Sequence, residues 1–250
     1  MSWDFTFKGI APSTKYCRLA TIPVITPSEI KRDRFDVPGR NGELLGADTY
    51  RSNAHVTMTI HCMEGWMSGM SHPIEYYMNM IRSWLSGSGE LVIKSGTSSE
   101  AKYIFEVLQV KIVSESYKNT DYGRLEVDFE VYPYNFLSDA HTSRTDSTYT
   151  LTVSNPADVS LPLIVVTGVG NGTLTVNGNT MTYSGIGLGN LKIDVRRQIA
   201  YQDYNNTKTN KSNDVNGDYA GLVLKNGTNT LTLSNTAHIV AVYPLWGYFI

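Results

Sequence analysis

The sequence comprises 250 residues, of which 41% are hydrophobic and 18% are charged, and its formal net charge at neutral pH is -2. This composition is typical of a folded globular protein with a sizeable core and excludes an intrinsically disordered chain. The small net charge excludes a broad basic surface for nucleic acid, and no apolar run is long enough to cross a bilayer.

The first residues lack the basic segment and apolar run of a signal peptide, so we expect the protein to fold and assemble in the cytoplasm. Cys17 and Cys62 are too few for a disulfide framework, and we predict two buried, reduced thiols.

Two turn signals lie close together between strand-like segments in the first part of the chain. A first strand is predicted around Trp3 to Lys8, and a proline-marked edge strand from Cys17 to Pro27. In the segment from Arg34 to Leu45, Pro38-Gly39 is typical of a type II turn, and Asn41-Gly42 favours a tight hairpin turn. The sequence therefore predicts a hairpin with Arg40 at its tip, which is either a simple turn or a rigid contact arm.

An alternating strand and a glycine-rich loop follow this hairpin. Val56, Met58, Ile60 and Cys62 alternate with polar residues, which predicts a half-buried strand. The loop from Met63 to Ser71 carries Trp66 and Met67, residue types that suit contact with a protein partner. The alternative is that this loop folds back over the helix that follows it.

One helix is predicted to begin at Pro73 and to end at Gly87. Apolar residues recur along it at helical spacing and form one stripe, which we interpret as a core face: Ile74, Tyr77, Met78, Ile81, Trp84 and Leu85.

The strands after the helix complete the first half of the chain. Segments 90–94 and 101–114 read as adjacent strands, and in segment 125–131 apolar residues alternate with Glu126, Asp128 and Glu130. One helix among several antiparallel strands predicts a helix-capped β-sandwich or barrel. The acidic face is interpreted as a solvated surface or as a partner for basic residues across a subunit boundary.

The composition changes after Glu130, which is the last glutamate of the chain. A polar stretch near residues 138–147 predicts a boundary between a domain at 1–140 and a second domain at 141–250. In the second domain, Asn177-Gly178 and Asn226-Gly227 each predict a hairpin between short alternating strands. This pattern favours a jelly-roll-like β-sandwich, so the predicted fold class is mainly β with one α-helix.

No pattern for catalysis, metal binding or cofactor binding is present. Glu126, Asp128 and Glu130 share one open face, whereas glycoside hydrolysis needs two carboxylates on opposite sides of the scissile bond. The histidines and cysteines lack the spacing of metal ligands, and no nucleophile elbow or phosphate-binding glycine loop occurs. The sequence therefore predicts a binding or assembly protein without enzyme activity.

Aromatic residues of the second half offer a weak candidate for glycan or partner contact. Tyr201, Asp203, Tyr204 and Asp218 are natural sugar contacts, and Trp246 and Tyr248 would extend the aromatic platform. The alternative is that these aromatic side chains pack the sandwich or an interface.

Several segments resemble the distal tail proteins of long-tailed phages with non-contractile tails. The resemblance rests on the turn at 37–45, on Ile81-Arg-Ser-Trp-Leu85 and on the strand end at 129–133. In the second half it rests on segments 172–178, 191–194, 217–218, 224–231 and 244–246, which are similar to the family's galectin-like domain.

The resemblance implies a hexameric ring hub at the tail tip, without enzyme activity. The first domain would close the ring, and the second, a galectin-like sandwich, would face outward. The implied partners are the major tail tube protein, the tail-associated protein and a receptor-binding protein, and DNA would pass through the ring without specific binding. The alternatives are a carbohydrate-binding module in host-wall attachment and a wall hydrolase.

The expected subunit contacts come from three places: the hairpin, the methionine-rich loop and the acidic strand. They are Val37, Pro38, Gly39, Arg40, Asn41, Gly42, Glu43, Trp66, Met67, Glu126, Asp128 and Glu130.

Overall fold

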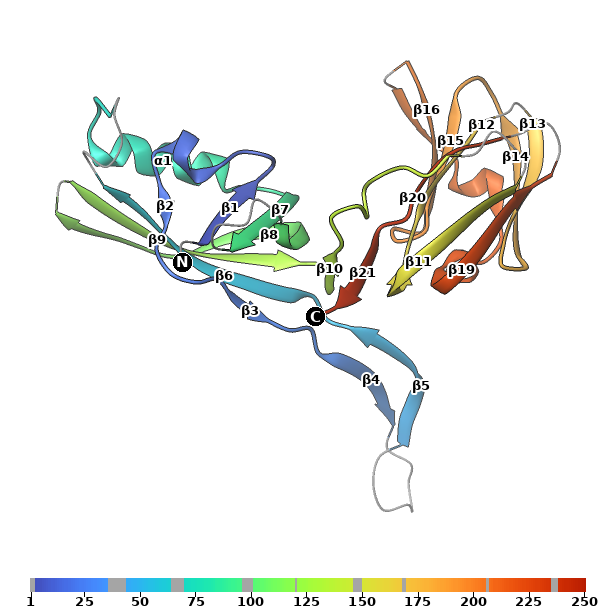
Figure 1. Cartoon of the computed structure of the whole chain (residues 1–250), viewed down its shortest axis with the longest axis horizontal. Coiled ribbons are helices and arrows are strands. Elements are labelled where there is room, and N and C mark those ends of the chain that lie inside the picture. Colours follow the sequence, from blue (N-terminus) through green and yellow to red (C-terminus); the bar gives the residue numbers. More distant parts are fainter. Residues whose placement is uncertain are drawn as a thin grey trace. The chain divides into compact units, whose positions relative to one another are not determined.

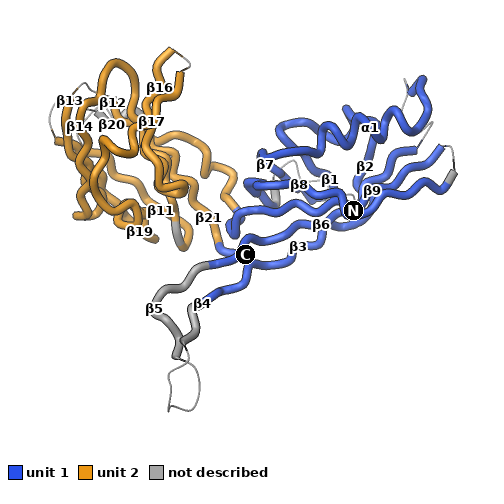
Figure 2. The backbone as a smooth tube through the Cα atoms, turned by 180° about the vertical axis from the view of Figure 1, so that it is seen from behind, with its two compact units in different colours: residues 1–135, 249–250 blue, residues 136–248 orange. Residues whose placement is uncertain are grey.

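The computed structural model describes residues 3–35, 44–63, 70–95, 101–119, 121–145, 150–167, 170–205, 207–234 and 238–250. The protein is mainly β with one α-helix, which confirms the predicted fold class (Figure 1). Two compact units share the chain (Figure 2): unit 1 contains Met1–Asn135 with Phe249–Ile250, and unit 2 contains Phe136–Tyr248.

Unit 1 is built on one main antiparallel sheet in the order β1-β7-β8-β9-β6-β2, with β3 also paired to β6. Its strands are β1 (Trp3–Phe7), β2 (Arg18–Leu19), β3 (Val24–Thr26), β6 (Ala54–Met63), β7 (Gly89–Ser95), β8 (Ala101–Asn119) and β9 (Tyr122–Val131). A short 3-10 helix, η1 (Pro12–Lys15), lies between β1 and β2. A separate hairpin pairs β4 (Ile30–Phe35) with β5 (Leu44–Arg51).

The helix α1 (Ile74–Trp84) covers one face of this sheet (Figure 1). The helix begins at Ile74, one position after the predicted start at Pro73, which is its N-cap residue. Its C-cap residue, Leu85, lies two positions before the predicted end at Gly87. The predicted apolar stripe is confirmed, because all six of its residues are buried. Trp84 joins the helix to β1, since its ring stacks on Phe5 at 5.7 Å and its Nε1 donates to the Phe7 carbonyl at 3.2 Å.

The two central strands of the sheet show the predicted alternation. β6 and β9 pair antiparallel, with Val56 opposite Phe129 and Met58 opposite Val127, and all four side chains are buried. Adjacent residues on a strand point to opposite faces, so the acidic residues of β9 lie on the face away from α1.

The last two residues of the chain belong to unit 1. Ile250 donates its backbone N–H to the Pro133 carbonyl at 3.2 Å, and its own carbonyl accepts from the Ser28 N–H at 2.9 Å. The Arg51 guanidinium lies 4.3 Å from the Phe249 ring centroid. This return of the chain was not predicted from the sequence.

Unit 2 contains two antiparallel sheets, each with one apolar face. The first has the order β10-β21-β11-β19-β13-β14-β18 and the second β17-β16-β15-β12-β20. The strands of the first are β10 (Tyr134–Phe136), β11 (Thr150–Ser160), β13 (Gly170–Val176), β14 (Asn179–Ile186), β18 (Val215–Asn216), β19 (Leu224–Leu233) and β21 (Trp246–Phe249). Those of the second are β12 (Leu163–Thr167), β15 (Asn190–Asp194), β16 (Ile199–Tyr204), β17 (Thr207–Asn210) and β20 (His238–Tyr243). Of two 3-10 helices, η2 (Ser212–Asp214) connects β17 of the second sheet to β18 of the first, and η3 (Tyr219–Leu222) connects β18 to β19 within the first.

The two Asn-Gly pairs of unit 2 behave differently. Asn177 and Gly178 both have positive φ and join β13 to β14, as predicted. The hairpin predicted at Asn226-Gly227 is wrong, because both residues lie inside the single strand β19. Gly227 has φ +88 beside a register shift against β11, and the Asn229 amide donates to the Gly227 carbonyl at 2.9 Å. The pair therefore forms a bulge that a buried side chain stabilises.

Cys17 and Cys62 are both buried and unpaired, as predicted. Burial is the main cause that raises the pKa of both thiols, and it raises that of Cys62 to about 11. Among the described residues, no helix is long and apolar enough to cross a membrane.

Candidate assembly and binding surfaces

The acidic residues of β9 are held by polar partners within the same chain. Glu126 accepts from the Ser114 hydroxyl at 3.1 Å on β8, and Glu130 accepts from the Asn53 amide at 2.6 Å. Asp128 lies 2.9 Å from Nδ1 of His55 on β6. These contacts fix the carboxylates on the open face of the sheet, where all three stay partly exposed. Their predicted role between subunits remains a prediction.

A groove of about 530 Å³ lies at the end of this acidic strand. It is lined by Thr26, Pro27, Glu29, Lys31, Arg51, Ser52, Asn53, His55 and Glu130. The lining contains both positive and negative side chains, so the groove suits a polar protein segment better than an apolar ligand.

The other predicted contacts of unit 1 lie outside the described residues. They are the hairpin tip from Val37 to Glu43 and the loop residues Trp66 and Met67. The strands on either side of the tip pair antiparallel, with Phe35 opposite Leu44. The two predicted turns themselves fall outside the described residues.

An aromatic group at the start of α1 was missed by the sequence analysis. The His72 ring lies 4.3 Å from the half-exposed Tyr76 ring, and Tyr16 lies 5.0 Å from Tyr77. The Tyr77 hydroxyl oxygen accepts from the Ser71 N–H at 2.7 Å. The adjacent Tyr76-Tyr77 pair beside His72 was the available signal, and only Tyr77 was placed in the core.

The structure brings together only part of the predicted sugar platform in unit 2. Tyr201 and Asp203 lie on the same face of β16, and Tyr204 ends that strand. Asp218 instead caps η3, where its carboxylate accepts from the Ala220 N–H, and η3 packs against β13 and β14. Trp246 is buried and donates to Asp139 at 2.8 Å, so it packs the interior as the alternative expected.

Basic residues that the sequence analysis missed surround Tyr201. The ammonium groups of Lys192 on β15 and Lys208 on β17 lie 5.8 Å and 5.5 Å from its ring centroid. Lys192 also donates to Asp203 at 2.8 Å. This hydrogen bond is the main reason that the pKa of Lys192 is raised and that of Asp203 is lowered. The sequence alone could not reveal these neighbours, because they depend on the register of three strands.

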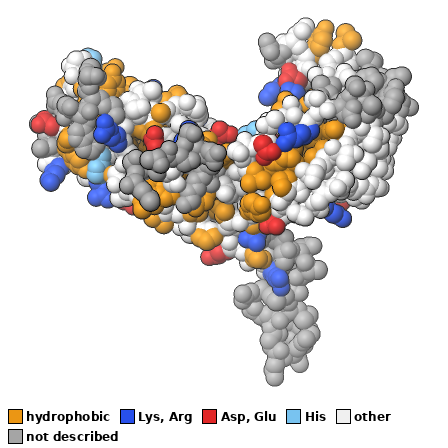
Figure 3. Space-filling view, in the orientation of Figure 1, with side chains coloured by type: hydrophobic (Ala, Val, Ile, Leu, Met, Phe, Trp, Pro, Cys, Tyr) orange, Lys and Arg blue, Asp and Glu red, His pale blue; other side chains and the backbone are white. Residues whose placement is uncertain are grey.

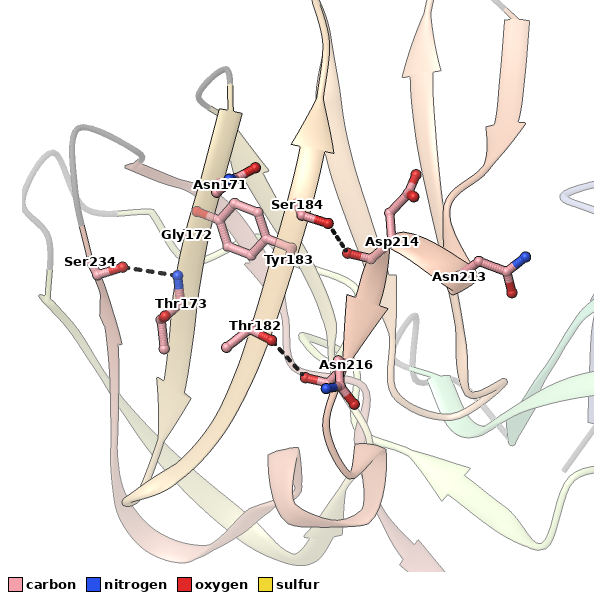
Figure 4. A pocket seen from close by; sticks show the side chains of 10 residues that line it. All are labelled: Asn171, Gly172, Thr173, Thr182, Tyr183, Ser184, Asn213, Asp214, Asn216 and Ser234. Carbon is pink, nitrogen blue, oxygen red and sulfur yellow. Dashed lines mark hydrogen bonds between the residues drawn. The ribbon is translucent and has the colours of Figure 1, made fainter.

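A second groove of unit 2, of about 370 Å³, is lined mostly by hydroxyl and amide groups (Figure 4). Its hydroxyls already serve the fold: Ser184 donates to the Asp214 carbonyl, Thr182 to the Asn216 carbonyl, and Ser234 accepts from the Thr173 N–H. The hydrogen bonds of Ser184 and Thr182 therefore join β14 to η2 and β18. The buried Tyr183 hydroxyl has no hydrogen-bond partner among the residues that the structure describes.

Within the described ranges, no group of three or more histidine, cysteine, aspartate or glutamate side chains could hold a metal ion. Positively and negatively charged side chains are scattered over the face of the molecule seen in Figure 3.

Two solved structures share the fold of the whole chain. The crystal structure of the Dit protein of phage SPP1, described as a paradigm of the hub adsorption apparatus in phages that infect Gram-positive bacteria, has 10% identity and a TM-score of 0.57. The likeness covers 97% of this chain and 98% of that one. A chain of the phage P2 baseplate, in its activated conformation with Ca, has 8% identity and a TM-score of 0.51 and covers 96% and 97% of the two chains.

The resemblance seen in the sequence is thereby confirmed at the level of the fold. No protein-family model and no curated protein sequence matches this chain.

Proposed function

We propose that the protein is a structural hub of a phage tail tip. One observation carries the proposal: the fold likeness to the SPP1 Dit protein includes both units in the same order and almost the full length of both chains. Two unrelated domains seldom meet by chance in this order, so the likeness supports a shared architecture even at 10% identity.

In this proposal, six copies close into a ring through unit 1. A ring of identical subunits places two different surfaces of each copy in contact, and closure removes their exposed strand edges. Charge supports the assignment of surfaces. Lys31 and Arg32 are exposed on β4, at the base of the predicted contact hairpin, and the acidic residues of β9 present the opposite charge. Val24 on the short strand β3 is 62% exposed, which adds an apolar contact.

The ring would connect the tail tube to the tail-associated protein and display unit 2 for a receptor-binding protein. DNA would pass through it without specific binding, a role that suits a chain with a net charge of -2. The protein would therefore act at the virion tail tip and not as an enzyme.

Negative-stain electron microscopy of the purified chain tests this proposal. We expect ring-shaped particles with sixfold symmetry, and the same rings in preparations that contain the tail tube protein. Uniform single particles of the size of one copy, at concentrations where tail proteins assemble, would contradict it.

The rival function is a carbohydrate-binding module in attachment to the host wall. Tyr201 and Asp203 on one face of β16 favour it, although the rest of the predicted platform lies elsewhere. Binding of a monomer on a glycan array, without rings in the micrographs, would favour the rival over the hub.

A further inference from the structure

A cleft beside Tyr201 has the chemical character of a ligand site. It encloses about 360 Å³, a size that suits a small molecule. It is lined by Arg197, Ile199, Ala200, Tyr201, Lys208 and Asn210. These residues come from β16, from β17 and from the turn before β16, so the cleft is built on an ordered hairpin.

Positive charge is in excess around this cleft. Lys192 is neutralised by Asp203 at 2.8 Å, and Arg197 lies 3.7 Å from the buried Asp194. Lys208 lies opposite Asp203 in the register of β16 and β17, and its charge also lowers the pKa of Asp203, so two lysines share this one carboxylate. Three cations therefore face two anions, in a chain whose total charge is negative. An anionic ligand would supply the missing partner.

The floor of the cleft suits the ring of a sugar. Ile199 is 40% exposed, and it lies next to Tyr201 on the same face of β16. Apolar and aromatic surface packs against the C–H groups of a sugar ring. Asn210, opposite Tyr201, supplies an amide that both donates and accepts hydrogen bonds from hydroxyl groups.

We infer that this cleft binds a sugar unit that carries an anionic group, with Lys208 and Arg197 facing the anion and Ile199 and Tyr201 facing the ring. A neutral sugar leaves the excess charge without a partner. An extended acidic peptide needs a longer groove than a cleft of about 360 Å³ provides. The inference goes beyond the hub proposal, because ligand binding and ring formation are measured separately.

Calorimetric titration of the full chain tests the inference. The probes are glucose 6-phosphate, glucuronate, glucose and inorganic phosphate, which separate a phosphate from a carboxylate and the ring from the anion. We expect millimolar binding of glucose 6-phosphate or glucuronate that weakens with salt, and at least about tenfold weaker binding of glucose. Of the two anionic sugars, the one that binds more tightly identifies the anionic group.

Three variants locate the site. Lys208→Gln and Arg197→Gln should each weaken binding about tenfold, because each removes one charged contact. Lys225→Gln, an exposed lysine on β19, should leave binding unchanged. Arg197 pairs with the buried Asp194, so circular dichroism must first show that its variant folds. Lys208 is exposed, and Asp203 keeps its hydrogen bond from Lys192 when Lys208 is replaced, so Lys208→Gln provides the decisive variant.

Four results would overturn the inference. Equal affinity for glucose and glucose 6-phosphate would remove the role of the anion. Equal affinity for inorganic phosphate and glucose 6-phosphate would remove the role of the ring. No detectable binding of either anionic sugar, or an undiminished affinity in Lys208→Gln, would exclude the cleft as the site.

Discussion

Replacement of Trp84 tests how much the contacts between α1 and β1 contribute to the stability of unit 1. The side chain is only 7% exposed, its ring stacks on Phe5 at 5.7 Å, and its Nε1 donates to the Phe7 carbonyl at 3.2 Å. Removal of a buried tryptophan side chain costs about 3–5 kcal/mol, and this one also removes one hydrogen bond to the Phe7 carbonyl, which still accepts from the Ile10 N–H at 3.0 Å. We therefore expect Trp84→Ala to lower the free energy of unfolding by about 4–5 kcal/mol.

Two further variants separate packing from hydrogen bonding. Trp84→Phe retains an aromatic ring but loses the donor, so its cost should fall to about 1–3 kcal/mol. Ser83→Ala, at an exposed position of the same helix, should change the free energy of unfolding by less than about 0.5 kcal/mol.

Urea unfolding of the three variants, with hydrogen exchange followed by mass spectrometry, measures these costs. Peptides from α1 and β1 should lose protection in Trp84→Ala before those of unit 2 do. The reasoning is refuted if Trp84→Ala and Ser83→Ala unfold within about 1 kcal/mol of each other, because the contacts of Trp84 would then contribute little.

Three other predictions follow from single positions. Arg40→Glu should weaken ring formation and leave each copy folded; an unchanged oligomeric mass by light scattering would exclude that role. Gly172→Ala should destabilise unit 2 by about 1–3 kcal/mol in thermal unfolding, because its new Cβ would lie 2.2 Å from the Tyr183 hydroxyl oxygen. Burial, and secondly the Arg124 charge, lower the pKa of His61 in the folded state. Its contribution to stability is therefore complete above the unfolded pKa of about 6.5 and decreases as the pH falls below it. Between pH 7 and 5, His61→Gln should reduce the loss of stability; an identical pH profile would contradict this.

Matched controls exist for these variants. Lys225→Glu reverses an exposed charge in unit 2 and should leave the oligomeric mass unchanged. Gly187→Ala meets its nearest neighbour at 3.8 Å, an ordinary contact distance, and should cost less than Gly172→Ala. The exposed His72 is the control for the pH dependence of His61.

Local pattern predicts the core of unit 1 well. The alternation of Val127 and Phe129 with acidic residues, and the helical spacing of Met78 and Ile81, each bury one face of an element. Such periodicity follows directly from backbone geometry and needs no information from distant residues.

Features that depend on distant contacts were not predicted. Asn226-Gly227 has the same sequence as a hairpin turn, but Asn229 and the pairing with β11 hold it as a bulge inside a strand. The return of Phe249 to unit 1 and the approach of Lys208 to Tyr201 likewise depend on the strand arrangement. Sequence reasoning found Tyr201 as part of an aromatic sugar platform but missed the neighbouring lysines, because these come from other strands.

The mass of the protein in solution tests the central claim most directly. Light scattering coupled to gel filtration should give about 167 kDa, which is six copies of a 27.8 kDa chain. A single species of 27.8 kDa at every concentration and in every buffer would contradict the claim that the protein works as a closed ring.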